Sequence, residues 1–295
     1  MKLSLIFGCC LWINLLAGQD NAFEPAVQGI YLVNPSYQVD FDSASRIAYW
    51  VHYELNAQEA DGQLKRTDDF RIDFRTKRSA STKSYRGSGY DRGHLKPAAD
   101  SKSSRGEMSQ SFLMTNMFPQ TPSLNRGIWR KLEEQVREWA IQYRTVHVTT
   151  GPSLETHGWL VDGVRVSTAC WKAVLRTSPD TCAIAFVMPN ASRVSGEIDW
   201  YMVSIDELEC QLQRDLFPGL PDSTEVRIEA NARLSDWKLT SSQSMKPVSS
   251  EPASAHERNN PSIGSVQCIG IAKSTGQRCR IKTSDPSGKC RYHRD

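Results

Sequence analysis

The sequence predicts an α+β fold, on three observations. Residues 49–55 and 145–150 are rich in β-branched and aromatic side chains, as strands usually are. Residues 164–175 and 182–188 flank a turn-forming Ser-Pro-Asp and predict an antiparallel hairpin. Residues 125–143 repeat apolar side chains at helical spacing. Because strands and helices do not alternate regularly, we expect a mixed antiparallel-sheet domain rather than an α/β fold.

The predicted helix over residues 125–143 has one continuous apolar face. Its apolar residues recur at spacings of four, four, three and four: Ile128, Leu132, Val136, Trp139 and Tyr143. Ser123 lies just upstream and is the expected cap, with Asn125 opening the helix. One face of this helix should therefore pack on the core.

The two ends of the chain differ from its body. Lys2 precedes an apolar run over residues 3–16, and Ala17-Gly18 then offers small residues for cleavage. Residues 1–18 therefore predict a removable secretory signal, a secreted or periplasmic protein, and no stable membrane association. The body spans residues 26–239. Residues 240–265 have the Ser- and Pro-rich composition of a linker, and residues 268–295 form a separate small unit.

The charge balance does not by itself identify a partner. The net charge is +3, and residues 241–295 carry nine Lys/Arg against four Asp/Glu. The first 240 residues therefore sum to about −2. A nucleic acid would have to be held by local basic clusters or by the tail.

The cysteines fall into two groups once a signal containing Cys9 and Cys10 is removed. In an oxidising compartment Cys170, Cys182 and Cys210 predict one disulfide and one free thiol, with the pairing left open. The tail holds Cys268, Cys279, Cys290 and His293, which are the ligand set of a closed tetrahedral Zn²⁺ site. We therefore predict a small zinc-binding module, the alternative being one disulfide with a spare thiol.

Residues 87–94 read G-S-G-Y-D-R-G-H and carry groups suited to phosphodiester hydrolysis. Such a reaction needs a base to activate water and positive charge near the phosphate. His94 titrates near neutrality and suits the first task, and the guanidinium fork of Arg92 matches phosphate oxygens.

A second set of candidates lies about thirty residues further on. The amide oxygen of Asn125 is a ligand for a hard cation, and Mg²⁺ commonly takes only one or two protein ligands. Glu133 follows eight residues later on the predicted helix. The alternative makes Asn125 a helix cap and Glu133 a solvated charge.

Three ordered motifs carry a family resemblance. They are Y-D-R-G-H-L-x-P-A-A-D, F-L-M-T-N-M-F-P-Q and L-N-x-G-x-W-x-x-L-E, and the match continues into residues 148–152 and 183–190. Over roughly residues 47–216 the chain resembles the DNA/RNA non-specific endonucleases. The resemblance implies a ββα-metal core inside a larger mixed domain.

The resemblance also implies roles for individual residues. His94 resembles the general base, Asn125 the lone protein ligand to Mg²⁺, and Glu133 the carboxylate that orients metal-bound water. Arg92 would contact phosphate, and a shorter alignment makes Arg66 the arginine that stabilises the transition state. Two further residues, Asn116 and Gln120, resemble supporting polar groups. The implied activity is sequence-nonspecific cleavage of DNA, RNA or both to 5′-phosphate products, with Mn²⁺ and Ca²⁺ as alternative metals.

Two other functions would leave different residues in the sequence. A catalytically weak nucleic-acid-binding protein would be expected to lack His94 or Asn125, and both are present. A phosphodiesterase for small substrates would need a cluster of Asp and His ligands. The other histidines of the body, His52, His147 and His157, do not form that pattern and are predicted to be structural. Substrate preference and oligomeric state stay open, and a homo-oligomer is compatible with the sequence.

Overall fold

The computed structural model describes residues 22–230, 232–237, 266–267 and 282–283. The predicted signal segment, the linker and the predicted zinc ligands Cys268, Cys279, Cys290 and His293 lie outside these residues. Within the tail only β12 (Val266–Gln267) and β13 (Lys282–Thr283) are described, and they pair antiparallel. None of the described helices has the length and apolar character needed to cross a membrane.

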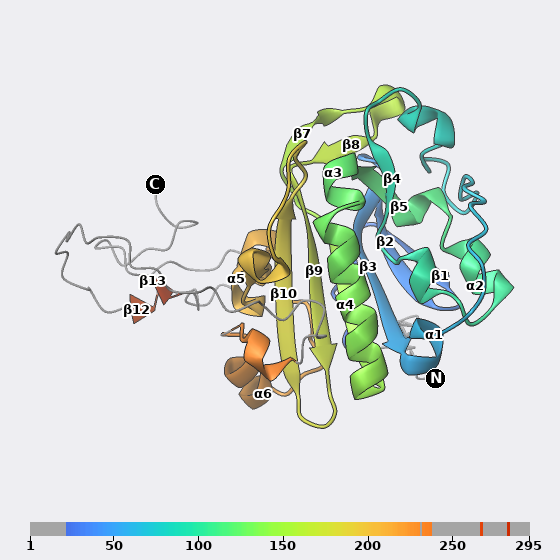
Figure 1. The fold of residues 1–295 in the computed structure, drawn as a ribbon. Helices are drawn as coiled ribbons and strands as arrows, with labels where there is room; N and C mark the ends of the chain where they lie inside the picture. The colour runs from blue at the N-terminus through green and yellow to red at the C-terminus, as the bar shows by residue number, and fades with distance from the viewer. Residues whose placement is uncertain (1–21, 231, 238–265, 268–281, 284–295) are drawn as a thin grey trace, which may run out of the picture.

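A seven-stranded antiparallel sheet forms the centre of the fold (Figure 1). The order of its strands is β1-β2-β3-β6-β9-β10-β11. Their bounds are β1 Ile30–Asn34, β2 Tyr37–Asp42, β3 Ile47–Asn56, β6 Thr145–Pro152, β9 Ala169–Arg176, β10 Cys182–Pro189 and β11 Met202–Val203. The two strands predicted over residues 49–55 and 145–150 lie in β3 and β6 and are confirmed.

The predicted hairpin is correct only in part. β9 and β10 pair antiparallel, with Cys182 opposite Arg176, as the turn between them suggested. Residues 165–167, however, form a separate strand β8 that pairs with β7 (Thr156–Trp159). The break falls at Thr168, where Asn190 contacts the end of β8 and the residue that follows it. Its backbone N–H donates to Thr168 O, and its side-chain amide donates to Ser167 O at 3.0 Å.

The predicted disulfide among the body cysteines is wrong, since Cys170, Cys182 and Cys210 are all free thiols. Cys182 lies opposite Arg176, six residues along β9 from Cys170. At about 3.3 Å per residue this places the two Cα atoms about 20 Å apart. A disulfide requires Cα atoms within about 7 Å. Cys210 lies on α5, which packs on the opposite face of the sheet from Cys170.

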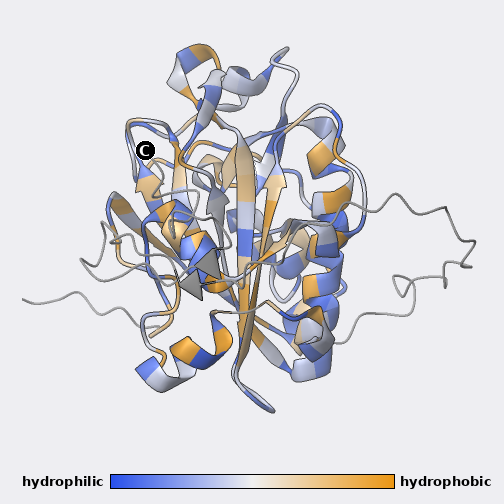
Figure 2. Ribbon diagram, turned by 90° about the vertical axis from the view of Figure 1, so that its left-hand side faces the viewer, coloured by the Kyte–Doolittle hydropathy of each residue, from blue (hydrophilic) through white to orange (hydrophobic). Residues whose placement is uncertain are grey.

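Helices cover both faces of the sheet. The helix α4 (Ile128–Tyr143) packs on one face together with the strands β4 (Asp91–His94) and β5 (Met117–Gln120). On the other face lie α5 (Ile205–Leu212) and α6 (Asp222–Ile228). The helices carry both hydrophobic and hydrophilic residues, as expected when one side packs on a sheet (Figure 2). The antiparallel pair β4–β5 and α4 form the expected ββα core.

Alternation along β9 decides which side chains reach each layer. Cys170 and Val174 belong to the core beneath α4. Trp171, Ala173 and Leu175 belong to the core beneath α5. This follows from the two-residue period of a strand. Lys172 falls in the first set and is fully buried on the α4 side.

The start of the main helix differs from the prediction. The short helix α3 (Pro122–Asn125) comes first, capped by the Thr121 hydroxyl rather than by Ser123. A turn through Gly127 then precedes α4, which begins at Ile128. Asn125 is therefore the last residue of α3 and not the first of α4. Its side chain caps no helix and is available for another contact.

Short elements connect the layers. Those between β3 and β5 are α1 Ala57–Ala60, η1 Thr82–Tyr85, η2 Ala98–Asp100, α2 Arg105–Gln110 and η3 Met114–Asn116. The buried carboxylate of Asp100 links three of the elements. It accepts from the Tyr53 hydroxyl on β3 at 3.1 Å and from the Arg137 guanidinium on α4 at 2.9 Å. Besides the apolar packing of α4, this carboxylate therefore joins α4 to β3 through an ion pair and a hydrogen bond.

We expect Asp100→Ala to lower the free energy of unfolding by about 3–5 kcal/mol, because it leaves the Arg137 charge buried without its partner. Glu134→Ala is the matched control. It removes the exposed Arg130–Glu134 pair of the same helix and should cost less than about 1 kcal/mol. Urea unfolding of both variants measures the difference. Equal losses would show that the buried pair does not anchor α4.

Candidate active site

The motif D-R-G-H forms the whole of β4, and a glycine turn leads into it. Gly87 and Gly89 have φ values of +69° and +81°, which side chains other than glycine rarely adopt. β4 then pairs with β5 so that Asp91 lies opposite Gln120 and His94 opposite Met117. The two-stranded ribbon thereby fixes the order of the candidate residues in space.

The two predicted supporting residues are fully buried and hold this ribbon together. The Asn116 amide nitrogen donates to Lys96 O and Ser111 O, and its oxygen accepts from Lys96 N at 2.9 Å. Asn116 therefore fixes the chain just after His94. The side chain of Gln120 covers Gly93 so closely that a Cβ there would lie 2.0 Å from its oxygen. The structure thus places both residues in the scaffold of the ribbon.

His94 lies in an aromatic pocket and is 8% exposed. Its ring centroid is 5.6 Å from that of Phe70 and 5.1 Å from that of Phe112. Burial, reinforced by the charges of Arg66 and Arg92, lowers the pKa of His94 to about 3. Among the described residues nothing hydrogen-bonds to its Nε2 atom. The imidazole is therefore neutral near pH 7 and has a ring nitrogen free to take a proton.

Two arginines flank this histidine over the same aromatic rings. The Arg92 guanidinium carbon lies 4.0 Å from the centroid of Phe70, and that of Arg66 lies 4.8 Å from the centroid of Phe112. The structure thus brings Arg66, Arg92 and His94 together around one aromatic pocket. Two fixed positive charges beside a neutral base suit an anionic substrate.

The side chain of Asn125 is hydrogen-bonded to Asp91. The Asn125 Nδ2 donates to Asp91 Oδ2 at 2.9 Å, and Arg126 binds the same carboxylate. An ionised carboxylate can accept hydrogen bonds but cannot donate them. The pKa of Asp91 lies below its usual value, mainly because Arg126 binds its carboxylate. The amide of Asn125 must therefore turn its nitrogen to Asp91. Its oxygen is left for another ligand, and a hard cation fits that donor.

Glu133 lies on α4 above a buried group of charges. Burial raises its pKa to about 7, the positive charge of Lys172 opposes the rise, and Asp100 adds to it. The Lys172 Nζ lies 5.1 Å from the ring centroid of Trp129 and 5.8 Å from that of Tyr53. Glu133 is therefore not a simple solvated charge, because burial raises its pKa. It is not an isolated core residue either, because charged side chains surround it.

Several residues of this site were missed from the sequence. Asp91 is part of the motif, but its bond to Asn125 spans 34 residues and has no local signal. Phe70 and Phe112 read as ordinary core residues. Lys172 did leave a signal, since it is a lone charge in the otherwise apolar stretch A-C-W-K-A-V-L of β9.

The other described histidines lie on β3, β6 and β7. His52 on β3 is fully buried and contacts the Thr149 hydroxyl through Nδ1 at 2.8 Å. His147 on β6 stacks near it, with ring centroids 6.4 Å apart. His157 is exposed on β7.

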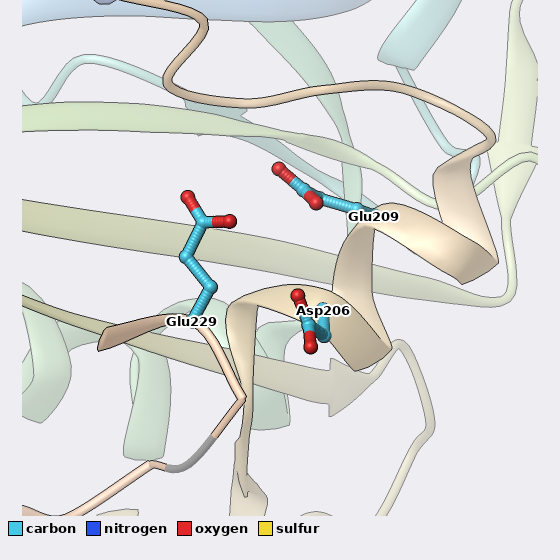
Figure 3. A group of neighbouring side chains, drawn as sticks. All are labelled: Asp206, Glu209 and Glu229. Atoms are coloured by element: carbon cyan, nitrogen blue, oxygen red, sulfur yellow. The ribbon is translucent and has the colours of Figure 1, made fainter. Parts of the chain in front are cut away.

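A separate group of carboxylates lies on the other side of the sheet. The carboxylates of Asp206 and Glu209 on α5 and of Glu229, just after α6, approach within 4.8 Å of one another (Figure 3). Burial and the neighbouring Glu229 hold the pKa of Glu209 well above its usual value. α5 packs on the face of the sheet opposite to α4, so this group is separate from His94.

Comparison with known proteins agrees with this geometry. Residues 19–223 match the family model of the DNA/RNA non-specific endonucleases. A nuclease of Nostoc sp. is 31% identical over 234 residues, which cover 74% of this chain and 85% of that protein. Human mitochondrial endonuclease G is 38% identical over 120 residues, 40% of each chain. A chain in the crystal structure of the EndoG/EndoGI complex shares the fold, with a TM-score of 0.63, 24% identity and coverage of 67% of this chain and 89% of that one.

The fold and the family match define the class of protein. The chain belongs to the DNA/RNA non-specific endonuclease family. It is a nucleic-acid-hydrolysing enzyme, and its substrate is a nucleic acid.

The low pKa of His94 predicts a pH-dependent stability. In the unfolded chain this histidine has a pKa of about 6.5, so the unfolded state takes up a proton that the folded state does not. Stability from this group is complete above pH 6.5 and is lost as the pH falls towards 3, by at most about 1.4 kcal/mol per pH unit. His94→Gln should therefore flatten the fall in unfolding free energy between pH 6.5 and 4.

Exposed His157→Gln is the control and should leave that slope unchanged. Both variants should keep a residual slope, because His52 also has a low pKa. Its pKa is about 3, mainly because the side chain is buried. Urea unfolding at a series of pH values measures the slopes. A wild-type slope in His94→Gln would contradict the neutral, buried histidine.

Proposed function

We propose that the enzyme is a Mg²⁺-dependent, sequence-nonspecific endonuclease with His94 as general base and Asn125 as the protein ligand of the metal. The observation that supports this most is the bond from Asn125 to Asp91. It turns an amide oxygen outward beside the strand that also carries His94. This donor is the kind Mg²⁺ prefers, and one protein ligand is sufficient for it.

His94 takes the proton of the attacking water in this proposal. Its unpartnered Nε2 is the accepting atom, in the tautomer that carries its proton on Nδ1, and the low pKa keeps the ring neutral at neutral pH. Arg92 and Arg66 contact the phosphate oxygens and stabilise the negative charge that develops there. Bound Mg²⁺ would supply further positive charge at the phosphate and at the leaving 3′-oxygen. The products are 5′-phosphorylated fragments.

Glu133 has a positioning role in the proposal. Its carboxylate accepts hydrogen bonds from water near Asn125 and so orients it, which requires the ionised form. Lys172 favours that form from beneath. In this proposal no side chain of the site contacts a base. The contacts of Arg66, Arg92, His94 and Asn125 go to phosphate and water, so both DNA and RNA are expected substrates.

The direct test is to incubate the purified protein with plasmid DNA and with RNA, with and without EDTA. Cleavage of both without sequence bias, abolished by EDTA and restored by Mg²⁺, is expected. Cleavage that survives EDTA would exclude metal dependence. A single recognition sequence at the mapped ends would exclude nonspecific cutting.

His94→Ala should lower kcat by about 10²–10⁴, because general-base catalysis contributes about that much. His157→Ala is the control, and its kcat should equal the wild-type value. Steady-state cleavage of a fluorescent oligonucleotide measures both. Wild-type kcat in a folded His94→Ala variant would remove the assignment.

Asn125→Ala should raise the Mg²⁺ concentration for half-maximal activity by more than about tenfold, and Asn125→Asp should restore part of the activity through its oxygen ligand. Asp91→Asn should weaken the metal response by about 10- to 100-fold, since it no longer fixes the amide of Asn125. Metal titrations of the three variants give the values. A wild-type titration curve for Asn125→Ala would exclude the ligand role.

A further inference from the structure

A cationic cavity lies beside the aromatic pocket of His94. It has a volume of about 400 Å³ and is lined by residues 63–67, which follow α1, and by Arg105 and Met108 of α2. The lining contains Lys65, Arg66 and Arg105 and no carboxylate. Two other cavities have the opposite character. One of about 730 Å³ is lined by Glu155 and Glu207 without any Lys or Arg, and one of about 210 Å³ by Glu54, Glu59 and Glu107.

The cavity and the pocket of His94 share a wall. Arg66 lines the cavity and lies 4.8 Å from the ring centroid of Phe112, which is itself 5.1 Å from that of His94. Leu64 packs against the small core cluster that contains Met108 and Phe112. A ligand in the cavity would therefore lie next to a ligand bound at His94.

Within the described residues, two of the three cationic side chains of the cavity form no ion pair. Arg66 is paired with Asp68, but within the described residues neither Lys65 nor Arg105 forms an ion pair. Nearby carboxylates already have other partners. Asp69 binds Arg71, and the Glu107 carboxylate accepts from the Ser103 hydroxyl. Both free cations are exposed, and they lie on separate segments that meet at the cavity.

We propose that this cavity binds the nucleotide next to the scissile phosphate, with Lys65 and Arg105 contacting its phosphate group. Leu64 and Met108 provide an apolar surface for the sugar or the base. Contacts of this kind read no sequence, in keeping with a nonspecific enzyme. The proposal rests on the proposed function, because it places a second phosphate beside the one at His94.

The test compares the double variant Lys65→Ala/Arg105→Ala with Arg227→Ala/Arg233→Ala. The second pair removes the same charge from a different cavity, which is lined by α6 and the segment after it. The full chain is mixed with a fluorescein-labelled 20-base-pair duplex in EDTA, and anisotropy gives Kd between 50 and 200 mM salt. Circular dichroism confirms that each variant is folded.

Each phosphate contact adds about 0.9 to the slope of log Kd against log salt. Losing two contacts should therefore lower the slope by about 1.8. Over this range Kd of the wild type should rise about twelvefold more than that of the Lys65/Arg105 variant. The control pair should keep the wild-type slope. A wild-type slope in the Lys65/Arg105 variant, or an equal loss in the control, would overturn the proposal.

Cleavage of the same duplex in Mg²⁺ separates this proposal from the proposed function. If the wild type binds but does not cut and the Lys65/Arg105 variant has the lower salt slope, the nuclease assignment fails, while the phosphate contacts of Lys65 and Arg105 stand. If the wild type cuts and the Lys65/Arg105 variant has the wild-type salt slope, only the cavity assignment fails. In the expected case the variant raises KM and leaves kcat within about twofold of wild type, because the cavity binds a neighbouring nucleotide rather than the reacting phosphate.

Discussion

The hydrogen bond from the Asn125 amide to Asp91 joins the two halves of the site. Asp91 begins the strand that ends at His94, and Asn125 ends the short helix that precedes α4. Because a carboxylate can only accept, the bond decides which way the amide points. The pairing of β4 with β5 fixes one end of this contact, and the packing of α4 on the sheet fixes the other. The proposed base and the proposed metal ligand thus take their relative positions from secondary structure rather than from mobile loops.

Beneath this contact the structure keeps charged groups inside its core. Asp100, Arg137 and Lys172 lie under Glu133, between α4 and the sheet. Burying charge is costly, and an apolar core of the same shape would often be as stable. These three groups act on the charge of Glu133: Lys172 and Arg137 lower its pKa, and Asp100 raises it. Burial, together with the charges of Arg66 and Arg92, favours the neutral form of His94. Burial also raises the pKa of Glu133, to about 7, and the positive charge of Lys172 limits that rise.

Local patterns predicted the framework better than its connections. The β-branched runs identified β3 and β6, and the apolar spacing identified α4, because these signals come from residues close in sequence. The start of α4 was misplaced, since Thr121 and Gly127 divide what the spacing alone made continuous. The break after β8 is marked by contacts from the distant Asn190, and the absence of a disulfide among the body cysteines follows from strand register. Neither is visible in the local sequence. Family resemblance selected Arg66, Arg92, His94 and Asn125. It did not reveal Asp91 as the partner that orients Asn125, or Lys172 beneath Glu133, because those contacts exist only in the folded chain.

A single measurement can decide whether a divalent cation binds at the Asn125 oxygen, as proposed. Crystals of the protein soaked in Mn²⁺ would show the ion by its anomalous scattering. The predicted result is one peak about 2 Å from the Asn125 side-chain oxygen, the distance for a small hard cation, with water completing its shell. The Asp91 carboxylate should still accept from the Asn125 nitrogen in that structure. A peak only among Asp206, Glu209 and Glu229 on the opposite face of the sheet, with none at Asn125, would contradict the account.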